Sequence, residues 1–192
     1  MDLKELNPKL YEAWVAQKKL GPDFFQESTD EDIEAIEAEV KAELPQDYKK
    51  FLRKYSSILT NRQIGANYFT MKFQDADVIA MDSTLIPWAQ LTLKATRRLG
   101  RTMTTDPDIG PRVPAGVVPL TIDNQSTLLI DVRSDHFGTI WYLPEIKRQT
   151  FGTDTYNWKD IGFVASSFTE FLRELDTEEA LKAKHPTFKV LN

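Results

Sequence analysis

Residues 44–55, with the sequence LPQDYKKFLRKY, constrain the fold of this chain more than any other segment. Pro45 cannot extend a preceding helix, but it suits the first turn of a new one, where Asp47 complements the helix dipole. Four residues then recur at the i, i+3, i+4, i+7 spacing of one helix face: Tyr48, Phe51, Leu52 and Tyr55. Because a helix with such a one-sided pattern must bury its apolar face, the segment predicts a helix that packs on a sheet.

A second, acidic helix precedes this one. Either Ser28 with Glu31 or Thr29 with Asp32 has the spacing of a capping box, so the helix begins at one of these two positions. Its narrow apolar stripe consists of Ile33, Ile36, Val40 and Leu44. Since Pro45 ends it, the two helices are expected to meet at a fixed corner.

The alternation of apolar and polar residues predicts strands elsewhere. Residues 69–73 form one such segment, and residues 118–122, 128–132 and 140–142 form three more, which are separated by turns at 123–125 and 133–138. The last three predict an antiparallel meander. Residues 75–101 are expected to be mostly helical with a break, and residues 102–116 to form a surface loop. Ser167 and Glu170 have capping-box spacing before a further apolar helix.

These patterns predict an α+β fold with a mainly antiparallel sheet, a central meander and helices packed against it. Residues 1–27 are expected to form an N-terminal helical extension that begins near Asn7 and turns its Trp14 side to the domain. Residues 28–192 are expected to form a single domain.

Composition excludes several kinds of chemistry. The chain of 192 residues contains no cysteine, which excludes disulfides, thiol catalysis and cysteine metal sites. Its formal net charge of −5 argues against nucleic-acid binding. Asp135 beside His136 is interpreted as part of an exposed turn and not as half of a catalytic dyad. We therefore expect no enzyme activity, no cofactor and no metal site.

Two charged faces allow more than one interpretation. Residues 30–47 contain eight acidic residues against one lysine, Lys41, which indicates either a solvated helix face or an acidic docking surface. Another helix face carries Lys94, Arg97, Arg98 and Arg101 and indicates either a contact for an acidic partner or phosphate, or again a solvated face. The chain shows no apolar signal core and no apolar run of membrane-spanning length, so a cytoplasmic, non-membrane location is expected; the oligomeric state is left open.

Three separate pieces of the sequence together resemble the SUKH superfamily of Smi/Knr-type proteins. The first piece contains Ile33, Ile36 and Glu37, followed by Leu44, Pro45, Asp47, Tyr48, Phe51 and Leu52. The second contains Leu129, Asp131, Gly138, Ile140, Trp141 and Tyr142, and the third contains Ala165, Ser167, Phe168, Phe171 and Leu172. The resemblance spans residues 28–176. It leaves residues 1–27 and 75–116 unexplained, and the turn at 123–126 lacks the Gly-Asp step that family members often carry there.

The resemblance implies a SUKH-like α+β fold without catalysis. It further implies an immunity protein that binds a cognate bacterial toxin domain, such as a nuclease or deaminase, and blocks it by occlusion. The alternative is a non-enzymatic regulatory scaffold or small-ligand-binding domain. The candidate partner-binding residues lie near the meander turns and loops and are Asp106, Asp108, Asp123, Asp131, Asp135, Trp141 and Glu145. Trp141 is as compatible with a core position as with a surface one.

Overall fold

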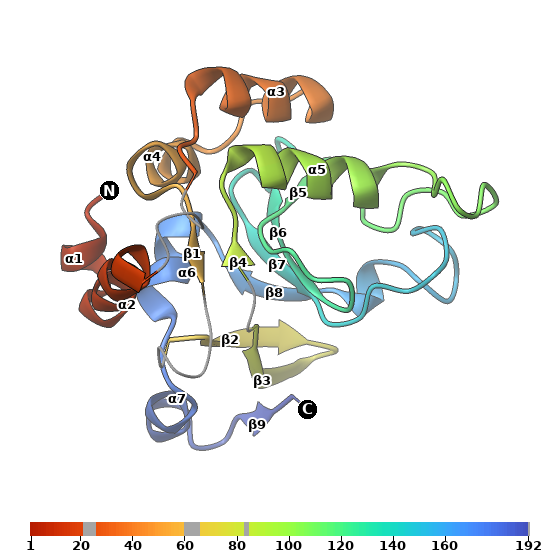
Figure 1. The fold of residues 1–192 in the computed structure, drawn as a ribbon. Coiled ribbons are helices and arrows are strands. Elements are labelled where there is room, and N and C mark those ends of the chain that lie inside the picture. Colours follow the sequence, from red (N-terminus) through yellow and green to blue (C-terminus); the bar gives the residue numbers. More distant parts are fainter. Residues whose placement is uncertain (21–25, 60–65, 83–84, 192) are drawn as a thin grey trace.

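The structure is a computed structural model that describes residues 1–20, 26–59, 66–82 and 85–191. Figure 1 shows α3, α4 and α5 gathered on one side of the molecule, with α7 and the C-terminal strand at the opposite end. The helices are α1 (Leu3–Leu6), α2 (Pro8–Leu20), α3 (Asp30–Val40), α4 (Gln46–Tyr55), α5 (Ala89–Gly100), α6 (Phe168–Glu174) and α7 (Glu178–Lys184), with a short 3-10 helix, η2 (Trp158–Asp160).

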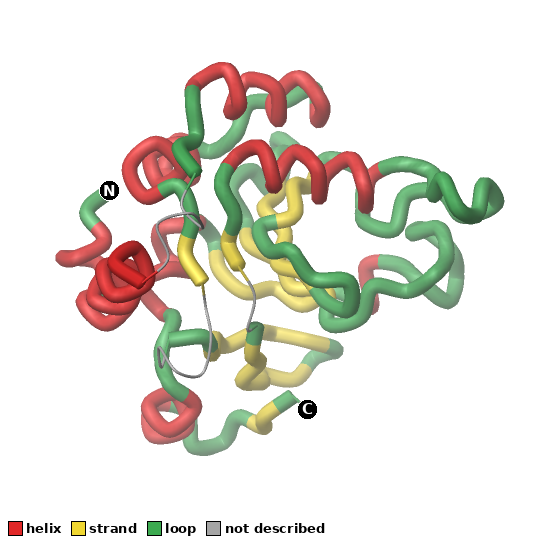
Figure 2. The backbone as a smooth tube through the Cα atoms, viewed as in Figure 1, coloured by secondary structure: helices red, strands yellow, loops and turns green. Residues whose placement is uncertain are grey.

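The strands confirm the predicted α+β class with its mainly antiparallel sheet (Figure 2). They are β1 (Ile58–Leu59), β2 (Tyr68–Phe73), β3 (Ala76–Met81), β4 (Leu85–Ile86), β5 (Val117–Pro119), β6 (Thr127–Asp131), β7 (Ile140–Leu143), β8 (Gly162–Ala165) and β9 (Lys189–Val190). Among the described residues, one sheet has seven strands in the order β5-β6-β7-β8-β2-β3-β9, and β1 pairs with β4. The β3–β9 pairing is parallel and the other pairings are antiparallel.

The predicted meander is confirmed as β5, β6 and β7. Val118 is in register with Ile130, and Leu128 with Tyr142, so the alternating apolar residues share one face of the sheet. Antiparallel β8 continues the meander and joins it to β2.

The expectation that residues 75–101 are mostly helical is wrong for the first part of that range. β3 pairs with β2 along its whole length, and the two strands are joined at Gln74 and Asp75, which have φ angles of 49° and 64°. A two-residue connection with both φ angles positive matches the twist of a hairpin. The following Val78, Ile79 and Ala80 are all buried, so the strand lacks the apolar–polar alternation that would have marked it in the sequence.

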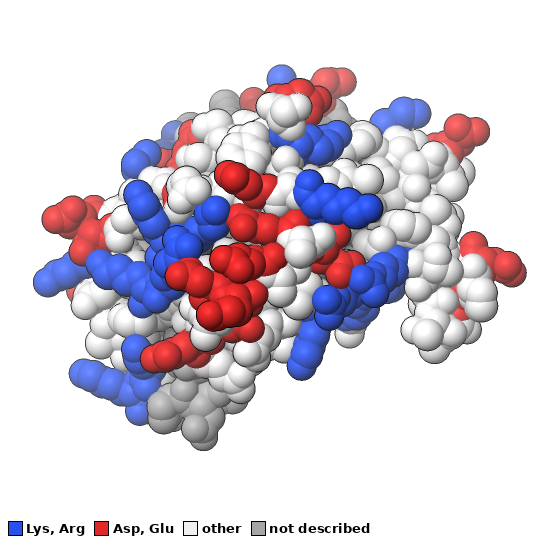
Figure 3. Space-filling view, turned by 90° about the horizontal axis from the view of Figure 1, so that it is seen from above, with Lys and Arg blue, Asp and Glu red and all other residues white. Residues whose placement is uncertain are grey.

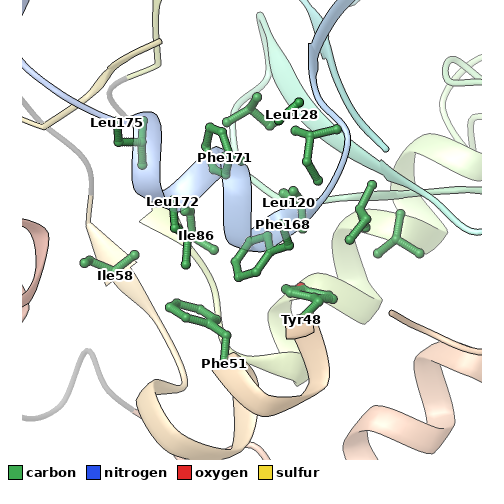
Figure 4. Packing of buried hydrophobic residues seen from close by; sticks show 14 of the residues in the cluster. Tyr48, Phe51, Ile58, Ile86, Leu120, Leu128, Phe168, Phe171, Leu172 and Leu175 are labelled. Carbon is green, nitrogen blue, oxygen red and sulfur yellow. The ribbon is translucent and has the colours of Figure 1, made fainter. Parts of the chain in front are cut away.

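The main core lies where α4 and α6 meet one face of the sheet (Figure 4). The predicted α4 stripe is buried as expected, and Phe168 of α6 packs edge-on against both Tyr48 and Phe51, at ring-centroid distances of 5.0 and 5.1 Å. Phe69, Leu128, Ile130 and Tyr142 supply the sheet side. Burial of these large rings is the main source of stability for this layer.

The start of α3 is decided by a capping box at Thr29 and Asp32. Thr29 accepts a hydrogen bond from the Asp32 N–H, and the Asp32 side chain accepts one from the Thr29 N–H, both at 3.2 Å. Ser28 does not cap α3; its buried hydroxyl accepts a hydrogen bond from the Ala89 N–H at the start of α5. Ser28 therefore ties the start of α3 to α5.

The N-terminal segment is joined to the same core. Leu3 and Leu10 are fully buried, and the Trp14 indole donates to the Tyr55 carbonyl oxygen. The side-chain amide of Asn7 donates to the carbonyl oxygens of Leu172 and Leu175 at the end of α6. The division into an N-terminal extension of residues 1–27 and a single domain of residues 28–192 remains a prediction. Among the described residues, no helix has the length and apolar character to cross a bilayer.

Candidate partner-binding site

The second face of the sheet carries an exposed aromatic cluster, which we call the aromatic platform and define as His136, Trp141, Trp158 and Phe163. Trp141 is its centre: the ring centroids of Trp158, His136 and Phe163 lie 5.5, 5.6 and 5.8 Å from that of Trp141, all edge-on. Trp158 is 37% exposed and Phe163 is 41% exposed. Large aromatic side chains gathered at the surface in this way mark an interaction site.

Strand register and a capped turn place these rings side by side. Trp141 of β7 is in register with Phe163 of β8, so both side chains stand on the same face. Trp158 comes from η2, which begins with a capping box in which Asn157 accepts from Lys159 and Asp160 accepts from the Asn157 N–H. Two strands and one short helix therefore converge on the platform.

Asp131 lies beneath the platform and is fully buried. Its carboxylate accepts hydrogen bonds from the Arg133 N–H, Nε and Nη2 and from the Trp141 Nε1, with donor–acceptor distances between 2.6 and 3.3 Å. The Asp131 carboxylate raises the pKa of Arg133. A buried carboxylate is tolerated when it is paired and hydrogen-bonded in this way.

Arg133 closes a ring of contacts that joins Asp131, Arg133, Trp141 and Trp158. Its guanidinium carbon lies 4.5 Å from the ring centroid of Trp158, a cation–π arrangement. Asp131 thus holds Trp141 by a hydrogen bond and Arg133 by an ion pair, and these two residues hold Trp158 from two sides. The absence of a side chain at Gly116 makes room for Arg133, because a Cβ there would lie 2.5 Å from the Arg133 Cγ. The side chains of the platform are therefore partly exposed to solvent, and these contacts hold them in position.

The structure corrects one of the predicted site residues. Asp131 was expected at the surface, but its side chain is inaccessible because the strand turns it inward beneath Trp141 and Arg133. It therefore offers no direct contact to a partner. Trp141 is half-buried, between the two alternatives that its sequence position allowed.

The other predicted residues are dispersed. Asp135 is exposed in the β6–β7 turn beside His136, with 3.5 Å between its Oδ2 and the His136 Nε2. Asp123 accepts from the N–H groups of Asn124 and Gln125 within its own turn. Asp108 and Glu145 are exposed and Asp106 is half-buried. The structure thus brings together only Asp131, Trp141 and the turn that carries Asp135, and the binding roles of these residues remain predictions.

Sequence reasoning missed Arg133, Trp158 and Phe163. Arg133 lies two residues after Asp131, the last residue of β6, and this spacing was the available signal, since oppositely charged residues two apart can pair at the end of a strand. Nothing in the sequence places Trp158 against Trp141.

Part of the charge of the acidic helix α3 is paired with basic side chains of its neighbours (Figure 3). Glu39 pairs with Arg97 and Arg101 of α5, and Asp30 pairs with Arg53 of α4. Hydrogen bonds from the two arginines lower the pKa of Glu39. Glu37 pairs similarly with Lys49. Glu31 and Glu34 of the same helix are exposed, so the acidic face is only partly balanced.

A groove of about 680 Å³ runs between α1, α4 and α6. Its lining is largely charged or polar and consists of Met1, Asp2, Glu5, Leu6, Gln46, Asp47, Lys50, Thr169 and Arg173. It lacks the predominantly apolar walls of a typical small-molecule site. Within the described part of the chain, no three acidic or histidine side chains are grouped as metal ligands.

The comparisons with known proteins define the class. Residues 27–174 match the model of the SMI1 / KNR4 family (SUKH-1), and the chain belongs to this family. The match includes residues 75–116, which the resemblance had left unexplained, and leaves α1, α2 and the C-terminal α7 and β9 outside. Membership is consistent with a toxin-system immunity protein. A search of curated proteins returns no match.

Proposed function

We propose that this protein binds and neutralises a cognate bacterial toxin domain, such as a nuclease or deaminase, in the cytoplasm. It would act by occlusion, through protein–protein contact and without a reaction of its own. Its membership of the SUKH-1 family supports a protein partner of this kind. We propose no binding to nucleic acid or to a membrane.

The aromatic platform is the observation that carries the proposal. Binding energy in protein interfaces is concentrated in a few residues, among which Trp, Tyr and Arg are enriched. The platform offers two tryptophans in mutual contact, and Arg133 lies over the ring of Trp158. All three side chains are partly exposed. A standard interface of about 1,600 Å² centred there would extend over the neighbouring turns.

Part of the acidic charge of α3 is paired within the protein. Asp30, Glu37 and Glu39 are in ion pairs, whereas Glu31 and Glu34 are exposed residues of the same helix. Because the proposed contact is centred on the aromatic platform and not on α3, the affinity for the toxin should change little with salt concentration.

The alternative of a regulatory scaffold or small-ligand-binding domain predicts a concave apolar pocket. The groove between α1, α4 and α6 does not have that character, because it is open and lined mostly by polar side chains.

The test begins with a tagged pull-down from the native cell, followed by identification and titration of the bound protein. The proposal expects one stoichiometric partner with nanomolar affinity that is toxic when expressed alone. Phe163→Ala should then weaken binding about 30-fold or more, the loss typical of a hot-spot residue. Phe137→Ala removes a ring of similar exposure from the neighbouring β6–β7 turn, outside the platform contacts, and should weaken binding less. Weak, heterogeneous partners would contradict the proposal, and a Phe163→Ala protein of unchanged affinity would move the interface elsewhere.

A further inference from the structure

We infer that Asp131 is the positioning residue of the recognition surface: it fixes Trp141 and Arg133 in the binding-competent arrangement without touching the partner. The partner contact rests on the proposed function, whereas the positioning is a property of the free protein. Asp131 is suited to this role because it is fully buried and bonds to both residues at once.

The backbone around Asp131 is held independently of its side chain. The Asp131 N–H donates to the Thr139 carbonyl oxygen, and the Asp131 carbonyl oxygen accepts from the Gly138 N–H. On the other side, Asp131 is in register with Val117 of β5. The strand and the turn that follows it therefore have their own hydrogen bonds, and the carboxylate is left to organise the platform.

Preorganisation is the physical benefit. A tryptophan and an arginine that can change rotamer in the free protein lose that freedom when they bind, and this loss opposes binding. Asp131 restricts the rotamers of both side chains when the protein folds, because its Oδ2 accepts hydrogen bonds from Trp141 Nε1 and Arg133 Nη2. The rotamer of Trp158 is restricted as well, because Arg133 lies over its ring.

The arrangement also indicates which chemical groups the partner presents. The Arg133 Nε and Nη2 groups are directed at Asp131, and among the described contacts Nη1 has no acceptor. The Arg133 side chain is 33% exposed. The surface therefore fits an apolar side chain of the toxin over Trp158 and Phe163, with a carbonyl or carboxylate oxygen beside it for the Arg133 Nη1.

The test compares Asp131→Asn with Asp75→Asn in the full chain. Both substitutions replace a carboxylate by an amide, but Asp75 is exposed in the turn between β2 and β3 and lies outside the ring of contacts. The chain has four tryptophans, so four indole N–H resonances report on their surroundings in the free protein. Asp131→Asn should shift the indole resonance of Trp141 and speed its exchange with water, and Asp75→Asn should leave that resonance in place.

Binding then provides the second measurement. Asp131→Asn should weaken the affinity for the toxin tenfold or more, and Asp75→Asn less than threefold. A folded Asp131→Asn protein with an unchanged Trp141 resonance would overturn the inference. A shifted resonance with unchanged affinity would support positioning in the free protein and instead contradict the platform as the toxin interface.

A further variant keeps the inference testable if Asp131→Asn does not fold. Arg133→Lys retains the charge but loses the planar fork that bonds Asp131 while covering Trp158. It should shift the indole resonance of Trp158 and weaken binding about tenfold. An unchanged Trp158 resonance and an unchanged affinity in this variant would overturn the inference.

Discussion

Asn7→Ala is expected to destabilise the whole protein, although Asn7 precedes the region that matches the family. The Asn7 amide donates to the Leu172 and Leu175 carbonyl oxygens at 2.9 Å, and its Oδ1 accepts from the Leu10 N–H at 3.1 Å. Asn7 is only 6% exposed, so water replaces these hydrogen bonds poorly. Three bonds of about 1 kcal/mol each give a loss of about 3 kcal/mol in the free energy of unfolding.

For a domain of this size, that loss corresponds to a decrease in Tm of about 6–12 °C. The assay is urea unfolding followed by both tryptophan fluorescence and far-UV circular dichroism. Asn157→Ala is the matched control, because Asn157 also makes three side-chain hydrogen bonds, all of them with residues of its own turn. That control should cost less than about 1 kcal/mol.

The reasoning would be refuted by an Asn7→Ala protein whose free energy of unfolding falls no more than that of the control. The N-terminal helices would then lie outside the cooperative unit, and the predicted division at residue 27 would separate two folding units. A single transition that shifts by the expected amount would instead place α1 and α2 within one domain.

Three further predictions concern stability. Phe168→Ala removes a fully buried ring that packs on Tyr48 and Phe51, and thermal unfolding should show a loss of about 3–5 kcal/mol. Gly162→Ala places a Cβ 2.2 Å from the Met71 Sδ, and urea unfolding should show a cost of about 1–3 kcal/mol. Glu39 has a folded pKa below its ordinary value of 4.5, so its ion pairs contribute stability above about pH 4.5, and this contribution is lost as the pH falls through the folded pKa. The stability difference between the wild type and Glu39→Gln, measured by urea unfolding, should therefore shrink from about pH 6 to about pH 3.

Periodic segments were the part of the fold that the sequence predicted best. The α4 stripe from Tyr48 to Tyr55 and the β5–β7 meander both carry apolar residues at the spacing of their own element, so their type follows from local physics. β3 was missed because a buried strand without alternation has no such signature, and the tight connection at Gln74 and Asp75 contains no glycine.

The candidate site was predicted less well than the fold. Asp131 and Trp141 were named from their place beside the meander turns, but the burial of Asp131 depends on which face its strand presents and on what covers that face. Asp106, Asp108, Asp123 and Glu145 were chosen as acidic loop residues, and loop composition alone does not specify which loops lie close together.

The sequence by itself determined the α+β class, the apolar stripe of α4, the meander and the family resemblance, because each depends on patterns that are local in the chain. The expected end of the acidic helix at Pro45 is wrong, because α3 ends at Val40 and Lys41 takes the left-handed conformation. Only the tertiary structure decided that three carboxylates of α3 pair with α4 and α5 and that Trp158 lies against Trp141 and Arg133. These contacts join segments whose spacing in the sequence carries no signal, so the charges and rings meet only when the helices and the 144–161 segment are packed in the folded chain.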